Sequence, residues 1–138
     1  MNRVLVIIPA FNEAESIGGV LHALQTHVPD YDIVVINDGS SDTTADVVRA
    51  FHSVELVTLP FNMGIGSAMQ TGYRYAEQEG YDIAVQCDAD GQQNENCKDS
   101  STVTVHDNSP VVFPVWLDHP LGAAPLRVVV CCHTASCL

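Results

Sequence analysis

The sequence predicts an α/β fold built on an open, mostly parallel β-sheet. Its apolar segments are continuous rather than alternating, which is typical of parallel strands that helices cover on both faces. These segments alternate with stretches of helical periodicity, and right-handed crossovers between successive strands then give an open sheet. With 138 residues the chain has the size of one domain and can bury a core.

The first unit is a strand at residues 4–8 followed by a helix. Asn12 is expected to cap this helix, and Pro29 is expected to end it. The apolar residues of the helix recur at the spacing of one buried face: Ile17, Val20, Leu21 and Leu24.

Two further units repeat this order and a fourth strand follows. A strand at residues 32–37 leads through the loop DGSSD into a helix that Ser40 or Ser41 caps and that packs Val48 and Phe51. A strand at residues 54–59 is followed by the turn NMGIGS and by a third helix, and the strand at 82–87 ends at Asp88. The third helix is expected to bury one side, made of Ile65, Ala68, Met69, Gly72 and Ala76.

A polar cluster follows each of the four strands: PAFNE, NDGSSD, PFNMG and DADGQ. Ligands of open α/β sheets bind beyond the carboxyl ends of the strands, so these clusters predict a site at one edge of the sheet. Asp38 directly follows a buried strand, and its carboxylate can accept hydrogen bonds from a base N–H or a ribose hydroxyl, while Gly39 allows close approach of the backbone. The same loop is also typical of a simple turn with a helix cap.

The cluster DADGQ has the composition of a cation site. A turn begun by Gly91 can bring Asp88, Asp90 and the amide oxygen of Gln92 around one point. These are hard oxygen ligands, which suit Mg²⁺ or Mn²⁺ bound together with a diphosphate. An isolated pair of this kind is also common in solvated acidic turns, and that interpretation stays open.

The charge of the chain excludes one class of partner. The formal net charge is -12, with five Lys and Arg residues in total, which argues against nucleic-acid binding. An anionic ligand would therefore be met by a metal ion, by backbone N–H groups or by helix N-termini.

Taken together, four segments resemble the nucleotide-sugar glycosyltransferases of the GT-A fold, family 2, with the polyprenyl-phosphate, dolichol-phosphate mannose synthase-like branch nearest. These segments are IIPAFNEAESI, DIVVINDGSSDTT, LPFNMGIGSAMQTGY and DIAVQCDADGQ. The resemblance covers residues 1–92 and implies a Rossmann-like nucleotide-sugar half. The C-terminal segment that follows is expected to be irregular, on the grounds of its composition.

The resemblance also implies site residues and a reaction. Pro9, Ala10 and Glu13 would line the nucleotide pocket, and Asp38 would hold the base. Asp88 and Asp90 would form the D-x-D pair that binds ribose and the divalent cation, and Gln92 would complete the metal set. The reaction would be inverting transfer from a UDP- or GDP-sugar with Mg²⁺ or Mn²⁺. A polyprenyl phosphate is favoured as the acceptor because it needs no general base, and a growing glycan, whose hydroxyl does need one, is the alternative; no such base is identifiable in the sequence.

Residues 93–138 depart from the family pattern. Four of the seven prolines and four of the five cysteines lie in this part of the chain. We interpret it as an atypical, partly disordered tail that begins with a change of reading frame or gene model near Gln93, and a genuine but divergent C-terminal segment is the alternative. The segments 111–117 and 126–132 can form strands, and their prolines favour irregular or edge positions.

Two other functions remain as alternatives. The chain can be a non-catalytic module that binds nucleotide and metal and lacks the acceptor half. A dinucleotide-binding oxidoreductase is disfavoured, because the glycines follow the third strand and not the first. Without a secretory signal and with an odd number of cysteines, we expect a cytoplasmic protein. The polyprenyl-phosphate acceptor that the resemblance implies would place it as a peripheral protein at the inner face of the membrane.

Overall fold

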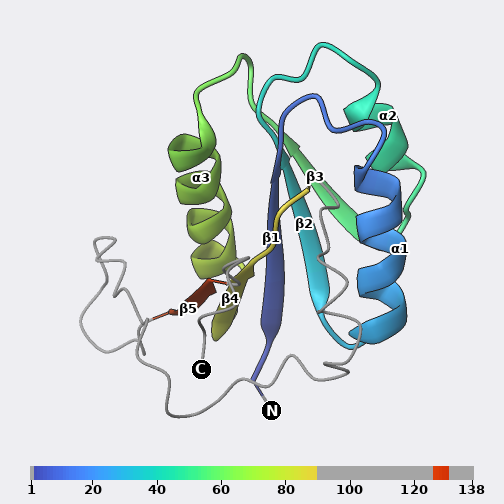
Figure 1. Cartoon of the computed structure of the whole chain (residues 1–138). Coiled ribbons are helices and arrows are strands. Elements are labelled where there is room, and N and C mark those ends of the chain that lie inside the picture. Colours follow the sequence, from blue (N-terminus) through green and yellow to red (C-terminus); the bar gives the residue numbers. More distant parts are fainter. Residues whose placement is uncertain (1, 90–125, 131–138) are drawn as a thin grey trace, which may run out of the picture.

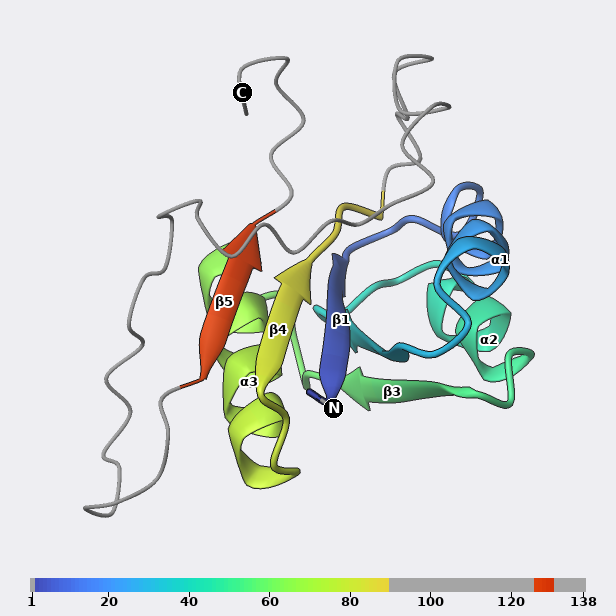
Figure 2. The same cartoon turned by 90° about the horizontal axis from the view of Figure 1, so that it is seen from below.

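Five parallel strands form one sheet in the computed structural model, which describes residues 2–89 and 126–130. The order across the sheet is β3-β2-β1-β4-β5. The strands are β1 (Val4–Ala10), β2 (Asp32–Asn37), β3 (Val54–Thr58), β4 (Ile83–Gln86) and β5 (Arg127–Val130). Figure 2 shows β5 beside β4 at one edge of the sheet, with which it pairs in parallel. The predicted open parallel sheet is confirmed. Within the segment 126–132, for which the sequence allows an edge strand, residues 127–130 form β5, and the segment 111–117 lies outside the described residues.

Helices cover both faces of the sheet (Figure 1). Helices α1 (Ile17–His27) and α2 (Thr44–Arg49) lie on one face, and α3 (Ile65–Gln78) lies on the other. Because side chains alternate along a strand, neighbouring residues of β1 enter different cores. Leu5 and Ile7 pack with α3, whereas Val4, Val6 and Ile8 pack on the α1 and α2 face.

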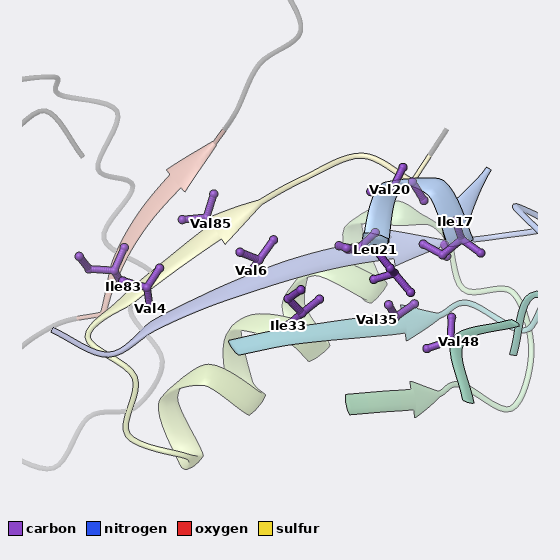
Figure 3. Packing of buried hydrophobic residues seen from close by; sticks show 13 residues of the cluster. Val4, Val6, Ile17, Val20, Leu21, Ile33, Val35, Val48, Ile83 and Val85 are labelled. Carbon is purple, nitrogen blue, oxygen red and sulfur yellow. The ribbon is translucent and has the colours of Figure 1, made fainter. Parts of the chain in front are cut away.

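The core under α1 and α2 is shown in Figure 3. Side chains of β1, β2 and β4 meet three residues of α1 and one of α2 there. The labelled members are Val4, Val6, Ile17, Val20, Leu21, Ile33, Val35, Val48, Ile83 and Val85. Three predicted core residues of the first helix are thus buried, and Leu24 packs against the cluster in a half-buried position.

The contact between α3 and the sheet depends on Gly72. A Cβ built on Gly72 would lie 2.4 Å from the Cγ2 methyl of Ile7, which is fully buried in β1. The helix therefore approaches the central strand at a position where no side chain fits. A Cβ at Gly64 or Gly66 would meet nothing within 4 Å, so close packing of the helix requires Gly72 and not these two glycines.

The helix starts differ from those predicted. Helix α1 begins at Ile17 with Ser16 at the N-cap, not at Asn12, and helix α2 has Thr43 at the N-cap, not Ser40 or Ser41. The reason is that the polar residues before each helix bond to other loops instead of capping.

Two side chains at the ends of elements are less buried than predicted. Ile65, expected in the core, is 62% exposed, because it is the first residue of α3 and lies next to the loop that follows β3. Cys87, expected within the fourth strand, lies just beyond β4 and is half-buried, because the strand stops at Gln86.

At the end of the sheet where β1 begins, Arg3 links the neighbouring elements. Its guanidinium donates to the carbonyl of Glu79 at 2.6 Å and lies 4.3 Å from the centroid of the Tyr81 ring. The Tyr81 hydroxyl donates to the Asp32 carboxylate at 2.8 Å. Partial burial, together with this hydrogen bond, raises the pKa of Tyr81 to about 12. The end of α3 and the start of β2 are thus tied to the beginning of the chain.

Replacing Gly72 by alanine should destabilise the protein. The added methyl overlaps the Ile7 side chain, and overpacking of this kind lowers the free energy of unfolding by about 1–3 kcal/mol. The matched control is Gly19→Ala, since Gly19 is exposed in α1 and its Cβ would meet nothing within 4 Å. That substitution should raise the free energy of unfolding by up to about 1 kcal/mol. Urea denaturation measures both, and a Gly72→Ala protein as stable as the parent would contradict the packing described.

Candidate functional site

The loops that follow β1, β2 and β3 lie together at one end of the sheet (Figure 1). Parallel pairing brings the end of β4 to the same edge, because β1 pairs with β2 on one side and with β4 on the other. The described residues of the four polar clusters therefore lie at the same end of the sheet, as predicted, and residues 90–92 of the fourth cluster lie outside the described part of the chain. Among the described residues, their loops span 11–16, 38–43, 59–64 and 87–89.

Asp38 is buried at the end of β2, with 3% of its surface exposed. One carboxylate oxygen accepts a hydrogen bond from the Met63 N–H at 2.8 Å, and the other accepts one from the Gly64 N–H at 2.9 Å. The Asp38 N–H donates to the carbonyl of Ala10 at 2.9 Å. This residue therefore fixes the turn before α3 and links it to the end of β1. The predicted contact of Asp38 with a base stays a prediction, and the structure adds a role inside the protein.

Gly39 allows two loops to touch through their backbones. Its φ of +68° lies in the left-handed region, which side chains other than glycine rarely adopt. A Cβ there would lie 2.4 Å from the carbonyl carbon of Phe61 and 2.5 Å from the nitrogen of Asn62. The close approach at Gly39 is thus to the loop after β3, and the predicted approach of its backbone to a ligand stays a prediction.

Asn12 joins the loop after β1 to the loop after β2. Its φ of 53° turns the chain, and its side-chain oxygen accepts hydrogen bonds from the N–H groups of Ser41 at 2.9 Å and Asp42 at 3.3 Å. The Asn12 N–H donates to the hydroxyl of Ser40 at 3.0 Å. The predicted capping role was wrong because this side chain bonds across the site, to amides about 30 residues further on. The usable signal was the tolerance of asparagine for positive φ.

Asp42 and Thr44 extend this link towards Glu13. The Glu13 N–H donates to the Thr44 hydroxyl at 3.0 Å, and the Ala14 N–H donates to the Asp42 carboxylate at 3.2 Å. The Thr44 hydroxyl donates to Asp42, and this bond is the main reason why the pKa of Asp42 lies below its usual value. The charged carboxylate of Asp42 is thereby favoured at the surface of the site.

The residues expected to line a nucleotide pocket differ in exposure. Ala10 is 2% exposed and packs in the core under α1, so its side chain is covered. Pro9 and Glu13 are half-buried. Of these three, Glu13 carries a functional group that a ligand at this edge can reach.

Asp88 follows β4 and is half-buried. Within the described part of the chain, no group donates a hydrogen bond to its carboxylate, in contrast to Asp38. The next residue, Ala89, is buried, and its carbonyl accepts a hydrogen bond from the hydroxyl of Ser16 at 2.7 Å. Asp90 and Gln92, the other predicted metal ligands, lie outside the described residues. Sequence reasoning missed Ser16, because its position before a helix indicates only a cap.

The charge at this edge is negative. The four loops contain Glu13, Glu15, Asp38, Asp42 and Asp88, and neither Lys nor Arg. A diphosphate bound there would need a cation or backbone N–H groups to balance its charge. Across residues 2–89 and 126–130, no three His, Cys, Asp or Glu side chains are grouped closely enough to hold a metal ion. The carboxylate of Asp88 fits a hard divalent cation as one oxygen ligand of a sparse set.

Apolar side chains flank these carboxylates. Phe11, Phe61, Met63 and Ile65 are large hydrophobic residues with 44% to 62% of their surface exposed, and all four lie on or next to the loops of the site. The edge therefore combines acidic groups with exposed apolar surface.

The sequence model described as glycosyl transferase family 2 matches residues 5–122. An undecaprenyl-phosphate mannosyltransferase of Micrococcus luteus is 41% identical over 93 residues, which are 64% of this chain and 38% of that protein. A UDP-N-acetylglucosamine–dolichyl-phosphate N-acetylglucosaminyltransferase of Methanococcus voltae is 35% identical over 106 residues, covering 64% of this chain and 41% of that protein. The chain thus spans about two fifths of the length of these relatives.

Solved structures show the same architecture. A mannosyltransferase of Pyrobaculum calidifontis in complex with GDP-Man and Mn²⁺ superposes with a TM-score of 0.59 and 30% identity, over 64% of this chain and 28% of that one. Glucosyl-3-phosphoglycerate synthase of Mycobacterium tuberculosis, in complex with Mn²⁺ and UDP-glucose, gives a TM-score of 0.53 and 26% identity, over 64% and 33% of the two chains.

Substituting Asp38 by asparagine should loosen the turn before α3. An amide offers one oxygen where the carboxylate offers two, so either the Met63 or the Gly64 N–H loses its acceptor in a buried place. Leaving such a donor unpaired costs about 1–3 kcal/mol, measurable by urea denaturation and by faster amide exchange at residues 63 and 64. Asp46→Asn, at an exposed ion pair with Arg49 on α2, should change stability far less. Equal effects of the two variants would show that Asp38 does not fix this turn.

Proposed function

The chain belongs to glycosyl transferase family 2, a family of enzymes, and from this membership we propose its reaction. The proposed activity is inverting transfer of a sugar from a UDP- or GDP-sugar to a polyprenyl phosphate, dependent on Mg²⁺ or Mn²⁺. The observation that carries this proposal is the half-buried Asp88 after β4, whose carboxylate receives no hydrogen bond within the described part of the chain. The described residues of the four loops around it include neither Lys nor Arg.

The proposal gives each site residue a role. Pro9, Ala10 and Glu13 belong to the segment beside the nucleotide, and the buried Ala10 would contribute backbone rather than side-chain contacts. Asp38 would act at the base, where its carboxylate also holds the Met63 and Gly64 amides in place.

Three residues would hold the divalent cation. Asp88 would bind it together with Asp90 and Gln92, and Asp88 would also contact the ribose. The cation would neutralise the charge that develops on the diphosphate leaving group. Mn²⁺ in the structures of the mannosyltransferase and the glucosyl-3-phosphoglycerate synthase supports a divalent ion in this role.

The transfer itself asks little covalent chemistry of the protein. An oxygen of the acceptor phosphate forms a bond to the anomeric carbon of the sugar, while the bond from that carbon to the nucleotide diphosphate breaks. The electron pair of the broken bond leaves with the diphosphate, and attack from the opposite side inverts the configuration. Because a phosphate acceptor is already an anion, no general base has to remove a proton. The residues of the four loops would bind and orient the donor.

The names of the relatives support the donor and acceptor classes. Undecaprenyl phosphate and dolichyl phosphate occur in the names of the two relatives, and GDP-Man and UDP-glucose are bound in the two solved structures. None of the described helices is long and apolar enough to cross a bilayer. We place the protein at the inner, cytoplasmic face of the membrane, where it would meet a lipid-linked acceptor.

A second candidate function is a module that binds nucleotide and metal without catalysing transfer. Its support is that the residues of the four loops, from Glu13 to Asp88, are those proposed to hold the donor and the cation, and none of them is proposed to act on the acceptor. Incubation with radiolabelled GDP-mannose or UDP-glucose and a polyprenyl phosphate separates the two functions. Labelled lipid would support the transferase, whereas nucleotide binding without labelled lipid would support the module.

We also propose a boundary near Gln93, between the nucleotide-sugar half at residues 1–92 and an atypical tail at residues 93–138. The support is the concentration of prolines and cysteines in the tail. The family match, which extends to residue 122, and the pairing of β5 with β4 both reach beyond this boundary. If the reading frame changes here, the nucleotide sequence across codons 90–100 should encode a continuation of the family pattern in another frame. Its absence would contradict the proposed frame change.

Removing a metal ligand should abolish metal-dependent donor binding and leave the fold intact. Asp90→Ala and Asp88→Asn each delete a charged oxygen ligand, so the affinity for GDP or UDP in the presence of Mn²⁺ should fall to its metal-free value. The loss should exceed the roughly 10–100-fold effect of changing a group that only supports a ligand. Titration calorimetry with and without Mn²⁺ measures the affinities, and circular dichroism checks the fold.

The control for this experiment is Asp30→Asn. Asp30 is an exposed carboxylate near the start of β2, at the opposite end of the sheet, and its removal lowers the negative charge equally. It should bind nucleotide and Mn²⁺ as the parent does. Unchanged manganese-dependent affinity in both site variants would refute the assignment of the metal site.

A further inference from the structure

We propose that Ser16 is a positioning residue, which holds the backbone between Asp88 and Asp90 and couples it to Glu13. This inference rests on the proposed function for its consequence, since that function makes Asp88 and Asp90 the metal ligands. The contact itself is independent of any ligand. It joins the start of α1 to a residue 73 positions further along the chain.

Ser16 does not act as a cap. It occupies the N-cap position of α1, where a serine side chain normally accepts a hydrogen bond from an N–H of the first turn. Here it makes no such bond. Its hydroxyl lies 2.7 Å from the Ala89 carbonyl oxygen instead. The helix start therefore gives up a local hydrogen bond, and the hydroxyl is used across the site.

Within the described part of the chain, few other hydrogen bonds hold the backbone at Ala89 in place. The ladder between β1 and β4 ends at Ile7 and Gln86, and the Cys87 N–H still donates to the Ile7 carbonyl at 3.0 Å. Beyond Cys87, within the described part of the chain, the bond from Ser16 is the only hydrogen bond that ties this segment to another element. The Ala89 side chain is buried in the core at 4% exposure. The hydrogen bond from the Ser16 hydroxyl and the buried Ala89 methyl together fix the backbone of Ala89, the residue that follows Asp88.

The Ser16 hydroxyl has a single proton to donate, and more than one acceptor lies within hydrogen-bond distance of it. The Glu13 carboxylate lies 3.0 Å from the Ser16 oxygen, and the Glu13 carbonyl lies 3.4 Å from it. The Ser16 hydroxyl can therefore donate its hydrogen bond either to the Ala89 carbonyl or to Glu13. Because Glu13 belongs to the loop that Thr44 and Asn12 hold in place, Ser16 connects that loop to the segment of Asp88. Displacement of one should therefore be felt by the other.

The test deletes the hydroxyl and asks whether the segment after β4 loosens. Ser16→Ala and Ser16→Gly should both speed amide hydrogen exchange at residues 87–89 in the protein without ligand. Glycine is tolerated at an N-cap almost as well as serine, so equal effects of the two variants separate anchoring from capping. Ser16→Thr keeps a hydroxyl and should restore slow exchange. Ser53→Ala is the control, since Ser53 accepts a hydrogen bond from Gln25 at 2.7 Å before β3, at the opposite end of the sheet.

A second measurement distinguishes positioning from general stability. In Ser16→Ala and Ser16→Gly, the affinity for GDP with Mn²⁺ should fall about tenfold, as for other groups that support a metal ligand, while the metal-free affinity for GDP stays the same. Unchanged exchange at residues 87–89 in both variants would overturn the inference, as would a parallel loss of both affinities. If the parent protein binds neither GDP nor UDP, the proposed function fails, and the exchange rates still decide whether Ser16 holds the segment.

Discussion

Parallel pairing of β1 on both sides is the constraint on which the rest of the structure depends. With β2 on one side and β4 on the other, all three strands end at the same end of the sheet, and the polar loops that follow them lie there together. Pro9 fits this arrangement, because the pairing with β4 ends at Ile7 and a residue without an N–H is tolerated where only β2 remains alongside. The apolar run that forms the core thus also determines where chemistry can take place.

Hydrogen bonds between loops turn this shared edge into one connected surface. Asp38 links the end of β2 to the turn before α3, Asn12 links the first two loops, and Ser16 links α1 to the segment after β4. In each link a side chain from one loop bonds to backbone atoms of another. Such bonds fix backbone positions, which is what a site needs in order to hold a ligand without rearranging. Asp88, whose carboxylate lacks a donor in the described residues, stands apart from this network as a group available for binding.

The strands and the buried helix faces could be predicted because they depend on local pattern. Ile17, Val20 and Leu21 are buried as their spacing indicates, since one helix face must meet the sheet. The roles of Asn12 and Ser16 could not be predicted, because both are good capping residues by type and their actual partners are distant in sequence. Ile65 fits the apolar spacing of α3 and is exposed all the same, since the spacing indicates which side of a helix is apolar and not how far along the helix that side is covered. The meeting of the four loops at one end of the sheet was predictable from topology, and two of the proposed metal ligands, Asp90 and Gln92, lie outside the described residues.

The strand order has a consequence for the order in which the protein can form during synthesis. β2 follows β1 closely, but β4, which pairs with the other side of β1, begins only at Ile83, and β5 begins only at Arg127. Until residue 86 has been made, β1 has an unpaired apolar edge, and until α3 exists one face of that strand is bare. Open edges of this kind invite pairing with other chains. A nascent chain that pauses between residues 37 and 86 would therefore be the most vulnerable to aggregation, and the Gly72 contact with Ile7 would mark the stage at which the central strand becomes covered.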